Sequence, residues 1–255
     1  MREKDYYGKR KNWSFGKYKI EYECLTNWDL SEILIELTNK DSKILDLGTA
    51  GGEKVLNEFP ECAEILGTDF SEEMIETANK SLKESGKDYI TFRVMDNLKM
   101  DVPEEYFDIV VARHTVTDPK QIMKCLKPGG HLLIRGVDKA DCLDLKLLLG
   151  CGQGFHDKEP ISIVDFKNVI NAGFKDVELV PIHEREYFQT KEDFIEFLKD
   201  VPILDDFSEE TLEHIKHEFT KKDYELLDKY IRENTYGGKI LLRRRYYGIS
   251  AQKKN

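Results

Sequence analysis

The sequence has few cysteines, and no two of them stand at C-x-x-C spacing. Its 5 cysteines are scattered along 255 residues, so neither a disulfide framework nor a structural zinc site is predicted. Long uncharged apolar runs are also absent, so we expect no membrane span. The first residues, MREKDYYGKRKNW, lack the apolar stretch of a secretory signal, which favours a cytoplasmic protein.

Acidic residues outnumber basic ones, with 49 Asp and Glu against 39 Lys and Arg. The formal net charge is -10 at pH 7, and the phosphates of a nucleic acid repel an acidic protein. A nucleic-acid partner is therefore disfavoured. Residues 1–20 are the exception, because they are rich in lysine and arginine. This basic arm either contacts an anion or is a solvated terminus.

What the chain does contain is an alternation of apolar runs with amphipathic segments. Five apolar runs are predicted to be strands, namely SKILDLG, AEILGTDF, YITFRVMD, FDIVVARH and HLLIRGVD. Strands that alternate with helices predict right-handed crossovers and a mostly parallel sheet that is covered on both faces. Two further strands, KDVELVPI and KILLRRRYYGIS, are predicted later in the chain.

The sequence pattern divides the chain into three parts. Residues 1–40 hold the basic arm and one helix, and the aromatic side chains of the arm suggest a lid over a bound cofactor. Residues 41–190 and 235–255 carry the predicted sheet. Residues 191–234 are charged and helix-periodic, and they are too many for a plain loop. This helical insertion either covers an acceptor site or packs its apolar side chains against the sheet.

A glycine-rich loop follows the first predicted strand, in the segment ILDLGTAGGEKV. In a parallel sheet, ligands bind at the carboxyl ends of the strands, and the start of the next helix suits an anion such as a carboxylate or a phosphate. A dinucleotide fingerprint fits poorly, because Ala50 and Glu53 stand where G-x-G-x-x-G needs glycines. No G-K-[ST] follows, so a P-loop is excluded.

Five segments in register carry a resemblance to a known family. ILDLGTAGG, GTDFSEEMIETA, RVMDN, FDIVVARH and LKPGGHLLI, in this order and spacing, resemble class I S-adenosylmethionine-dependent methyltransferases. The resemblance covers residues 42–137. It implies an α/β, Rossmann-like fold with a seven-stranded, mostly parallel sheet and helices on both faces. The last strand, here KILLRRRYYGIS, would run antiparallel, and the helical insertion would lie between the last two strands.

The resemblance also implies a site for S-adenosylmethionine. The loop from Asp46 to Gly52 would wrap its methionine part, and Asp69 would bind the ribose hydroxyls. Phe70 would cover the adenine, whose amino group would donate to Asp96. The full set of cofactor-binding residues implied in this way is Asp46, Gly48, Thr49, Ala50, Gly51, Gly52, Asp69, Phe70, Met74, Asp96, Asn97 and Arg113. Ala50 departs from the family, which usually has glycine there, so we expect a tighter loop.

His114 and Arg113 are the residues that the resemblance places beside the sulfonium and the acceptor. His114 is the candidate general base, because an imidazole titrates near neutrality, or else it only hydrogen-bonds in the cofactor pocket. Arg113 either orients an anionic acceptor or pairs with an acid. These two are the expected catalytic residues, and no metal is expected.

The sequence restricts the chemical class of the methyl acceptor but does not identify the acceptor. No N-P-P-Y or D-P-P-Y motif follows FDIVVARH, which disfavours methylation of the amino groups of nucleic-acid bases. No Pro-Cys pair follows it either, which disfavours methylation of cytosine at C5. We therefore expect in-line methyl transfer to a small-molecule acceptor. Two alternatives stay open: an enzyme that methylates RNA or a protein side chain, and a non-catalytic protein that binds the cofactor and serves as a partner. The sequence leaves the oligomeric state open.

Overall fold

The computed structural model describes residues 16–208 and 213–254. Its parallel strands are the five predicted from the apolar runs: β2 (Lys43–Leu47), β3 (Glu64–Asp69), β4 (Ile90–Val94), β5 (Phe107–Arg113) and β6 (Leu126–Val137). The sheet continues with β7 (Lys175–Phe188) and β11 (Lys239–Gln252). Because β11 lies between β6 and β7 and is antiparallel to both, the predicted fold class is confirmed.

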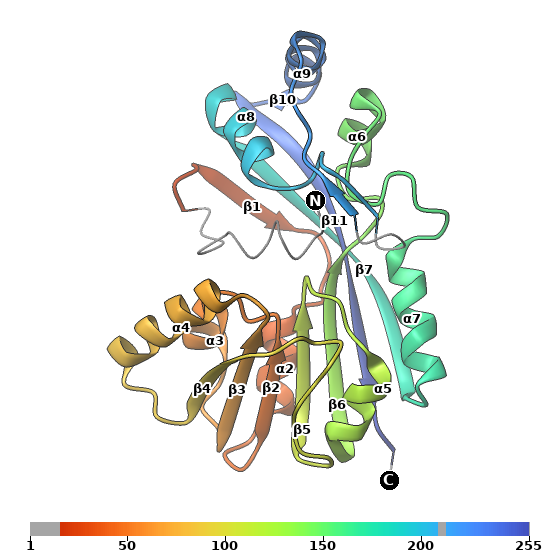
Figure 1. The fold of residues 1–255 in the computed structure, drawn as a ribbon. Coiled ribbons are helices and arrows are strands. Elements are labelled where there is room, and N and C mark those ends of the chain that lie inside the picture. Colours follow the sequence, from red (N-terminus) through yellow and green to blue (C-terminus); the bar gives the residue numbers. More distant parts are fainter. Residues whose placement is uncertain (1–15, 209–212, 255) are drawn as a thin grey trace.

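Two strands of the sheet were not predicted: β1 (Ile20–Cys24) and β10 (Thr235–Tyr236). Within the described residues, the sheet has nine strands in the order β1-β7-β11-β6-β5-β2-β3-β4, with β10 paired to β11 (Figure 1). Residues 21–24 of β1 are exposed, so this strand has no buried alternating face that a sequence pattern would reveal. Antiparallel main-chain pairing with β7 defines it.

Five helices pack against the two faces of the sheet: α2 (Leu30–Leu37), α3 (Glu53–Glu58), α4 (Glu72–Ser85), α5 (Pro119–Cys125) and α7 (Ile161–Asn171). On one face, apolar side chains of α2, α3 and α4 form a core with the strands. On the other face, α5 and α7 contribute to a second core. Burial on both faces accounts for the nearly continuous apolar runs of the central strands.

Side chains at the helix starts satisfy backbone N–H groups that have no partner within the helix. The Asp29 carboxylate, before α2, accepts hydrogen bonds from the N–H groups of Ser31 and Glu32 at 2.7 and 3.0 Å. Ser71 caps α4 by accepting from the N–H of Met74 at 3.3 Å. Each such cap stabilises a helix by about 1 kcal/mol. The Ser71 cap also fixes the start of α4 directly after β3.

The predicted helical insertion contains two helices and also two short paired strands. These elements are α8 (Lys191–Asp200), β8 (Asp206–Ser208), β9 (Glu213–Ile215) and α9 (Lys221–Glu233). Figure 1 shows α8 and α9 near α6 (Leu143–Leu149), toward the far end of the long strands β7 and β11. Apolar side chains of the insertion belong to a third core: Phe194, Phe197, Leu198, Ile203 and Leu204. They pack with one another and with the sheet, and a lid over the acceptor stays a prediction.

None of the helices in 16–208 and 213–254 has the length and the apolar composition that a membrane crossing requires. Residues 1–15, which include most of the aromatic side chains expected to cover the cofactor, lie outside the described residues. The lid formed by the N-terminal arm therefore stays a prediction.

Candidate functional site

The strand ends bring the predicted cofactor-binding residues to one edge of the sheet. Strands β2, β3, β4 and β5 are parallel neighbours in the order β4-β3-β2-β5, so their carboxyl ends lie side by side (Figure 1). The loop after β2 is tied to β3, because the N–H groups of Gly48 and Thr49 donate to the carbonyl oxygen of Thr68 at 2.8 and 2.9 Å. This edge is where parallel sheets bind ligands.

Two glycines shape the loop after β2. Gly48 and Gly52 have left-handed backbones, with φ of +76° and +79°. A Cβ atom would lie 2.7 Å from Cβ of Thr115 at Gly48, and 2.7 Å from the Phe92 ring at Gly52. Both positions therefore need glycine, for the turn and for close packing. Ala50 also has a positive φ of +50°, a conformation that costs an alanine roughly 1–2 kcal/mol.

The Asp69 carboxylate, which the resemblance assigns to a ribose, organises the segments beside it. Its Oδ2 accepts from the N–H of Ala50 at 3.0 Å, and its Oδ1 accepts from the N–H of Ser71 at 2.9 Å. Burial raises the pKa of Asp69, and the backbone N–H groups act in the opposite direction. A carboxylate has about four lone-pair sites, so acceptor capacity remains for ligand hydroxyls. Phe70 follows directly, and Met74 is buried in the first turns of α4.

Asp46 and Arg113 place opposite charges on neighbouring strands. Only 4% of the surface of Asp46 is exposed, and burial raises the pKa of its carboxyl to about 6, although Arg113 favours the charged form. Nη1 of Arg113 lies 3.8 Å from Oε2 of Glu58. Nη2 of Arg113 is buried, and no described residue hydrogen-bonds it. A buried donor without a partner is a place where a ligand atom fits.

Asn97 and Thr115 connect the segments after β4 and β5. Nδ2 of Asn97 donates to Oγ1 of Thr115 at 2.9 Å, whereas Oδ1 of Asn97 is buried and has no hydrogen-bond partner in the described part of the chain. Asp96 accepts from the N–H of Leu98 at 3.0 Å, which shapes the turn after β4. Sequence reasoning missed Thr115, because nothing in TVTDP marks a threonine that packs against Gly48 and bonds Asn97.

His114, the candidate general base, is held by one residue of the next strand. Its backbone has φ of +51°, and its N–H donates to the carbonyl oxygen of Arg135 at 2.8 Å. Nη1 of Arg135 lies 2.7 Å from Nε2 of His114. The side chain has exposed surface, yet the surrounding protein desolvates the ring. Desolvation, together with Arg135, Arg113 and Arg244, holds the pKa of His114 well below its ordinary value.

Arg135 belongs to a group of side chains that sequence reasoning missed. Its Nη2 donates to Oε1 of Glu184 at 2.7 Å, and its guanidinium carbon lies 4.1 Å from the centre of the Tyr246 ring. The guanidinium carbon of Arg244 lies 5.0 Å from the same ring. The one signal in the sequence was a charged residue near the end of the apolar run HLLIRGVD. Glu184 and Tyr246 come from β7 and β11, which only the fold brings beside Arg135.

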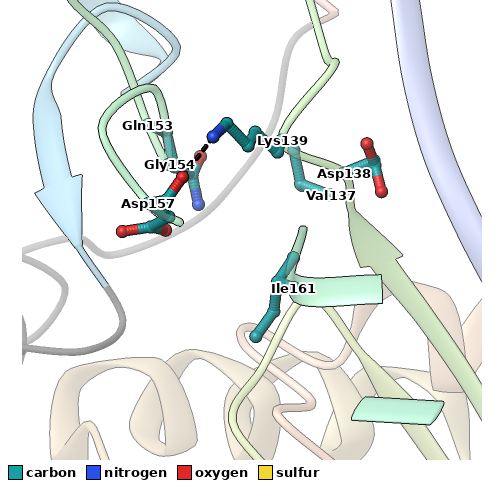
Figure 2. Close-up of a pocket in the computed structure, with 7 residues that line it drawn as sticks. All are labelled: Val137, Asp138, Lys139, Gln153, Gly154, Asp157 and Ile161. Atoms are coloured by element: carbon teal, nitrogen blue, oxygen red, sulfur yellow. Dashed lines mark hydrogen bonds between the residues drawn. The ribbon is translucent and has the colours of Figure 1, made fainter. Parts of the chain in front are cut away.

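A small cavity lies after β6, apart from these residues (Figure 2). Its volume is about 10 Å³, which holds roughly one water molecule. Its lining residues are Val137, Asp138, Lys139, Gln153, Gly154, Asp157 and Ile161. The Lys139 ammonium donates to the carbonyl oxygen of Asp157 across it. None of the predicted site residues lines this cavity, and it is too small for a nucleoside.

The described residues contain no group of three or more His, Cys, Asp or Glu side chains placed to hold a metal ion. His214 lies in β9, where its Nε2 is 2.7 Å from Oδ2 of Asp205. His217, two residues beyond β9, has its N–H bonded to Oδ1 of the same carboxylate at 3.0 Å. Asp205 thus holds this part of the insertion together.

Comparison with known proteins identifies the class of domain at this site. Residues 38–148 match the family model described as "Methyltransferase domain". The family resemblance drawn from the sequence motifs is thereby confirmed over these residues. The matched segment begins directly after α2 and ends in the last turn of α6, so it includes every residue predicted to bind the cofactor.

Two curated relatives are 27% identical to the chain over their aligned parts. The phosphoethanolamine N-methyltransferase of Plasmodium falciparum (isolate 3D7) aligns over 194 residues, which are 67% of this chain and 71% of the relative. The uncharacterized methyltransferase YcgJ of Bacillus subtilis (strain 168) aligns over 101 residues, 37% of this chain and 40% of the relative. The match to YcgJ therefore spans less than half of that protein's length.

Solved structures share the fold. A candidate methyltransferase from Bacillus halodurans C-125 has a TM-score of 0.59 at 17% identity, over 89% of this chain and 99% of that chain. Phosphoethanolamine N-methyltransferase 2 of Haemonchus contortus, in complex with phosphomonomethylethanolamine and S-adenosylhomocysteine, has a TM-score of 0.52 at 18% identity. That match covers 90% of this chain and 54% of the other. At such low identity these similarities show the fold alone.

Proposed function

We propose that this protein transfers the methyl group of S-adenosylmethionine to a small-molecule acceptor. The methyltransferase domain and the similar structure that holds S-adenosylhomocysteine support this cofactor. The observation that carries the proposal is a pair of buried polar atoms at the candidate edge of the sheet, Nη2 of Arg113 and Oδ1 of Asn97, which no described residue hydrogen-bonds. Buried polar groups are rarely left without a partner, so a polar ligand fits there.

The residues at this edge fit the cofactor in chemistry. Asp69 would accept hydrogen bonds from the ribose hydroxyls, the loop from Asp46 to Gly52 would receive the methionine part, and Asp96 would accept from the adenine amino group. When bound, the cofactor supplies an electrophilic methyl group on a positively charged sulfur. The carboxylates of Asp46 and Asp69 add negative charge at this edge, which favours a cationic ligand.

The task of the chain is to hold the acceptor in line with the methyl group and to exclude other geometries. His114 and Arg113 follow each other at the end of β5, next to the cofactor loops. In this proposal they border the acceptor. Because the pKa of His114 is held well below its ordinary value, its ring is neutral at pH 7.

The acceptor that we propose is a small molecule. The net charge of -10 disfavours a nucleic acid, and the Plasmodium relative is named for a small acceptor, phosphoethanolamine. Methylation of RNA or of a protein side chain, and cofactor binding without catalysis, are the alternatives that the test must separate. A cytoplasmic location stays a prediction.

Calorimetric titration with S-adenosylhomocysteine tests cofactor binding. We expect saturable heat with the wild-type protein. Asp69→Ala should weaken binding at least tenfold, because a hydrogen bond to a charged group contributes about 1.5–3 kcal/mol. Asp88→Ala, at an exposed position, is the matched control and should bind like wild type. A wild-type protein that gives no heat with this nucleoside, but does bind a nicotinamide dinucleotide, would contradict the proposal.

Methyl transfer itself is measured with radiolabelled S-adenosylmethionine against a panel of small amines, phenols, thiols and carboxylates. Turnover of at least one member is the expected result. Tight cofactor binding without turnover on this panel, on RNA or on protein would instead establish the non-catalytic alternative.

A further inference from the structure

We propose that Arg135 is a positioning residue that fixes His114 as a hydrogen-bond donor toward the acceptor. This inference rests on the proposed function, because the acceptor to which His114 would donate is part of that function. Its test needs no acceptor, because the position of the proton on His114 can be measured in the protein alone. It differs from the sequence-based expectation, in which His114 takes a proton from the acceptor.

The side-chain contact determines which imidazole nitrogen carries the proton. Nη1 of Arg135 lies 2.7 Å from Nε2 of His114. A guanidinium is always protonated and has no lone pair to offer. Nε2 must therefore be the acceptor, and the proton of the neutral ring must sit on Nδ1. No described residue hydrogen-bonds Nδ1, and the side chain has exposed surface, so an N–H donor is open to a ligand.

A backbone hydrogen bond also joins His114 to Arg135. The N–H of His114 donates to the carbonyl oxygen of Arg135 at 2.8 Å. This bond forms where the chain leaves β5 with a positive φ of +51° at His114. Such a backbone persists in a non-glycine residue only when the surroundings hold it. Main chain and side chain of Arg135 together fix both the position of the imidazole and its orientation.

Arg135 is itself immobilised from two further strands. Glu184 on β7 accepts from its Nη2 at 2.7 Å, and the Tyr246 ring on β11 lies against the guanidinium, 4.1 Å from its carbon. Only 20% of the Arg135 side chain and 22% of the Glu184 side chain are exposed, so this ion pair is partly shielded from water. A guanidinium held by a carboxylate and an aromatic face keeps its donor fork in one place.

The charges around His114 also oppose its protonation. Arg135 on β6, Arg113 on β5, Arg244 on β11 and Lys54 on α3 all act against an imidazolium. The carboxylate of Glu184 is already engaged by Arg135. Protonation of Nε2 would also break its bond from Arg135 and bring two cations together. A role as proton acceptor is therefore disfavoured by geometry as well as by charge.

The consequence concerns the acceptor. As the acceptor atom bonds to the methyl carbon, the carbon–sulfur bond breaks and sulfur keeps the electron pair. In this arrangement, a proton released by the acceptor passes to solvent and not to Nε2. Nδ1–H instead donates to an oxygen or nitrogen lone pair on the acceptor, which helps to orient it. Acceptors that carry such a group near the methylated atom are the class that fits.

The test locates the proton on the imidazole of His114 directly and needs no substrate. Long-range ¹H–¹⁵N spectra of the labelled full-length protein distinguish the two neutral tautomers of an imidazole. The signals of His114 are assigned as those that disappear in His114→Gln. We expect the Nδ1–H tautomer in the wild-type protein, and no protonation of the ring down to about pH 6. A proton on Nε2 in the wild-type protein would overturn the proposal, whatever any variant does.

Variants of Arg135 then test its role. Arg135→Met should populate the Nε2–H tautomer and shift ring protonation toward its ordinary range, because the donor and one cation are gone. Arg135→Lys should keep the Nδ1–H tautomer, because a cationic donor remains. Arg93→Gln, on the distant edge strand β4, is the matched control and should leave the His114 spectrum unchanged. An unchanged tautomer in folded Arg135→Met would refute the positioning role.

The calorimetric titration separates this inference from the proposed function. A protein that shows the Nδ1–H tautomer but binds no S-adenosylhomocysteine would refute the proposed function and confirm the arrangement of the two residues. A protein that binds S-adenosylhomocysteine but carries the proton on Nε2 would support the function and refute the inference.

Discussion

The N–H of Ala50 donates a hydrogen bond to Oδ2 of Asp69 at 3.0 Å, which joins the loop after β2 to the end of β3. The loop therefore takes its shape in part from the same carboxylate that is assigned to the ribose. Ala50 meets this bond with a positive φ of +50°. A residue with a strained backbone thus stands in the loop predicted to wrap the methionine part of the cofactor.

Replacing Ala50 by glycine should stabilise the protein. We expect Ala50→Gly to raise the free energy of unfolding by about 1 kcal/mol, because glycine adopts a positive φ without the penalty that a Cβ atom brings. Ala172→Gly is the control, since Ala172 has a right-handed backbone with φ of -74°; it should lower stability by roughly 0.5–1 kcal/mol. Urea unfolding measures both. Equal effects of the two changes would contradict the assigned strain.

Replacing Gly52 by alanine should have a larger effect of the opposite sign. A Cβ atom there would lie 2.7 Å from the Phe92 ring and 3.0 Å from Cβ of Ala78. We expect Gly52→Ala to lower the free energy of unfolding by about 2–4 kcal/mol, from backbone strain and overpacking together. Gly86→Ala is the matched control: its φ of +67° is also positive, but it has open space around it. Thermal unfolding that shifts equally in both variants would rule out the overpacking.

Because of Asp46, the free energy of unfolding should fall as the pH rises from about 4 to 6. Burial raises the pKa of its carboxyl to about 6 in the folded state, against about 3.9 in an unfolded chain. Between about pH 4 and 6 the folded state keeps a proton that the unfolded state has released, so stability falls as the pH rises through this window. The loss attributable to Asp46 reaches about 3 kcal/mol above the window.

The measurement for Asp46 compares Asp46→Asn with the wild-type protein by urea unfolding at a series of pH values. The two should be similar near pH 4, and the variant should become the more stable one by pH 7, because an amide mimics the protonated carboxyl. Asp41→Asn, at an exposed position, is the control and should change stability by less than about 0.5 kcal/mol throughout. A difference that does not grow between pH 4 and 7 would contradict the assignment.

Lys146 should control the order of the segment after α6. Its side chain is completely buried at 0% exposure, burial lowers the pKa of its ammonium group, and Nζ donates to the carbonyl oxygen of Gln153 at 2.7 Å. Lys146→Met keeps the stem and removes the donor. We expect faster amide hydrogen exchange in residues 150–154, measured by mass spectrometry. Lys120→Met, at an exposed position, should leave that exchange unchanged. Unaltered exchange in Lys146→Met would mean that other contacts hold the segment.

The parts of the fold that the sequence predicted are those with a local signal. The central strands β2, β3, β5 and β6 are apolar runs buried largely on both faces, and the edge strand β4 alternates buried Ile90 and Phe92 with exposed Thr91 and Arg93, so periodicity and composition mark all five. The strand β1 had no such signal, because most of its side chains are exposed and only pairing with β7 defines it. The hairpin β8–β9 was missed for a similar reason, within a segment whose composition favours helix.

The residues of the candidate site also fall into a group that the sequence could place and a group that it could not. Asp46, Asp69 and Arg113 stand at the ends of predicted strands, so topology alone places them at one edge. Arg135, Glu184 and Tyr246 could not be placed, because they come from three strands whose registers the sequence leaves open. The orientation of His114 depends on all three of these strands.

The sequence by itself determined the five parallel strands and their alternation with helices, the glycine loop and the carboxylates at the strand ends, because each depends on a few neighbouring residues and on the backbone that they prefer. Only the tertiary structure decided which nitrogen of His114 is engaged, which carboxyl is buried enough for its pKa to rise to about 6, and which polar atoms of the described residues lack a partner. Those properties arise from the distance between groups far apart in the chain and from the exclusion of water around them, and neither is written in any local stretch of residues.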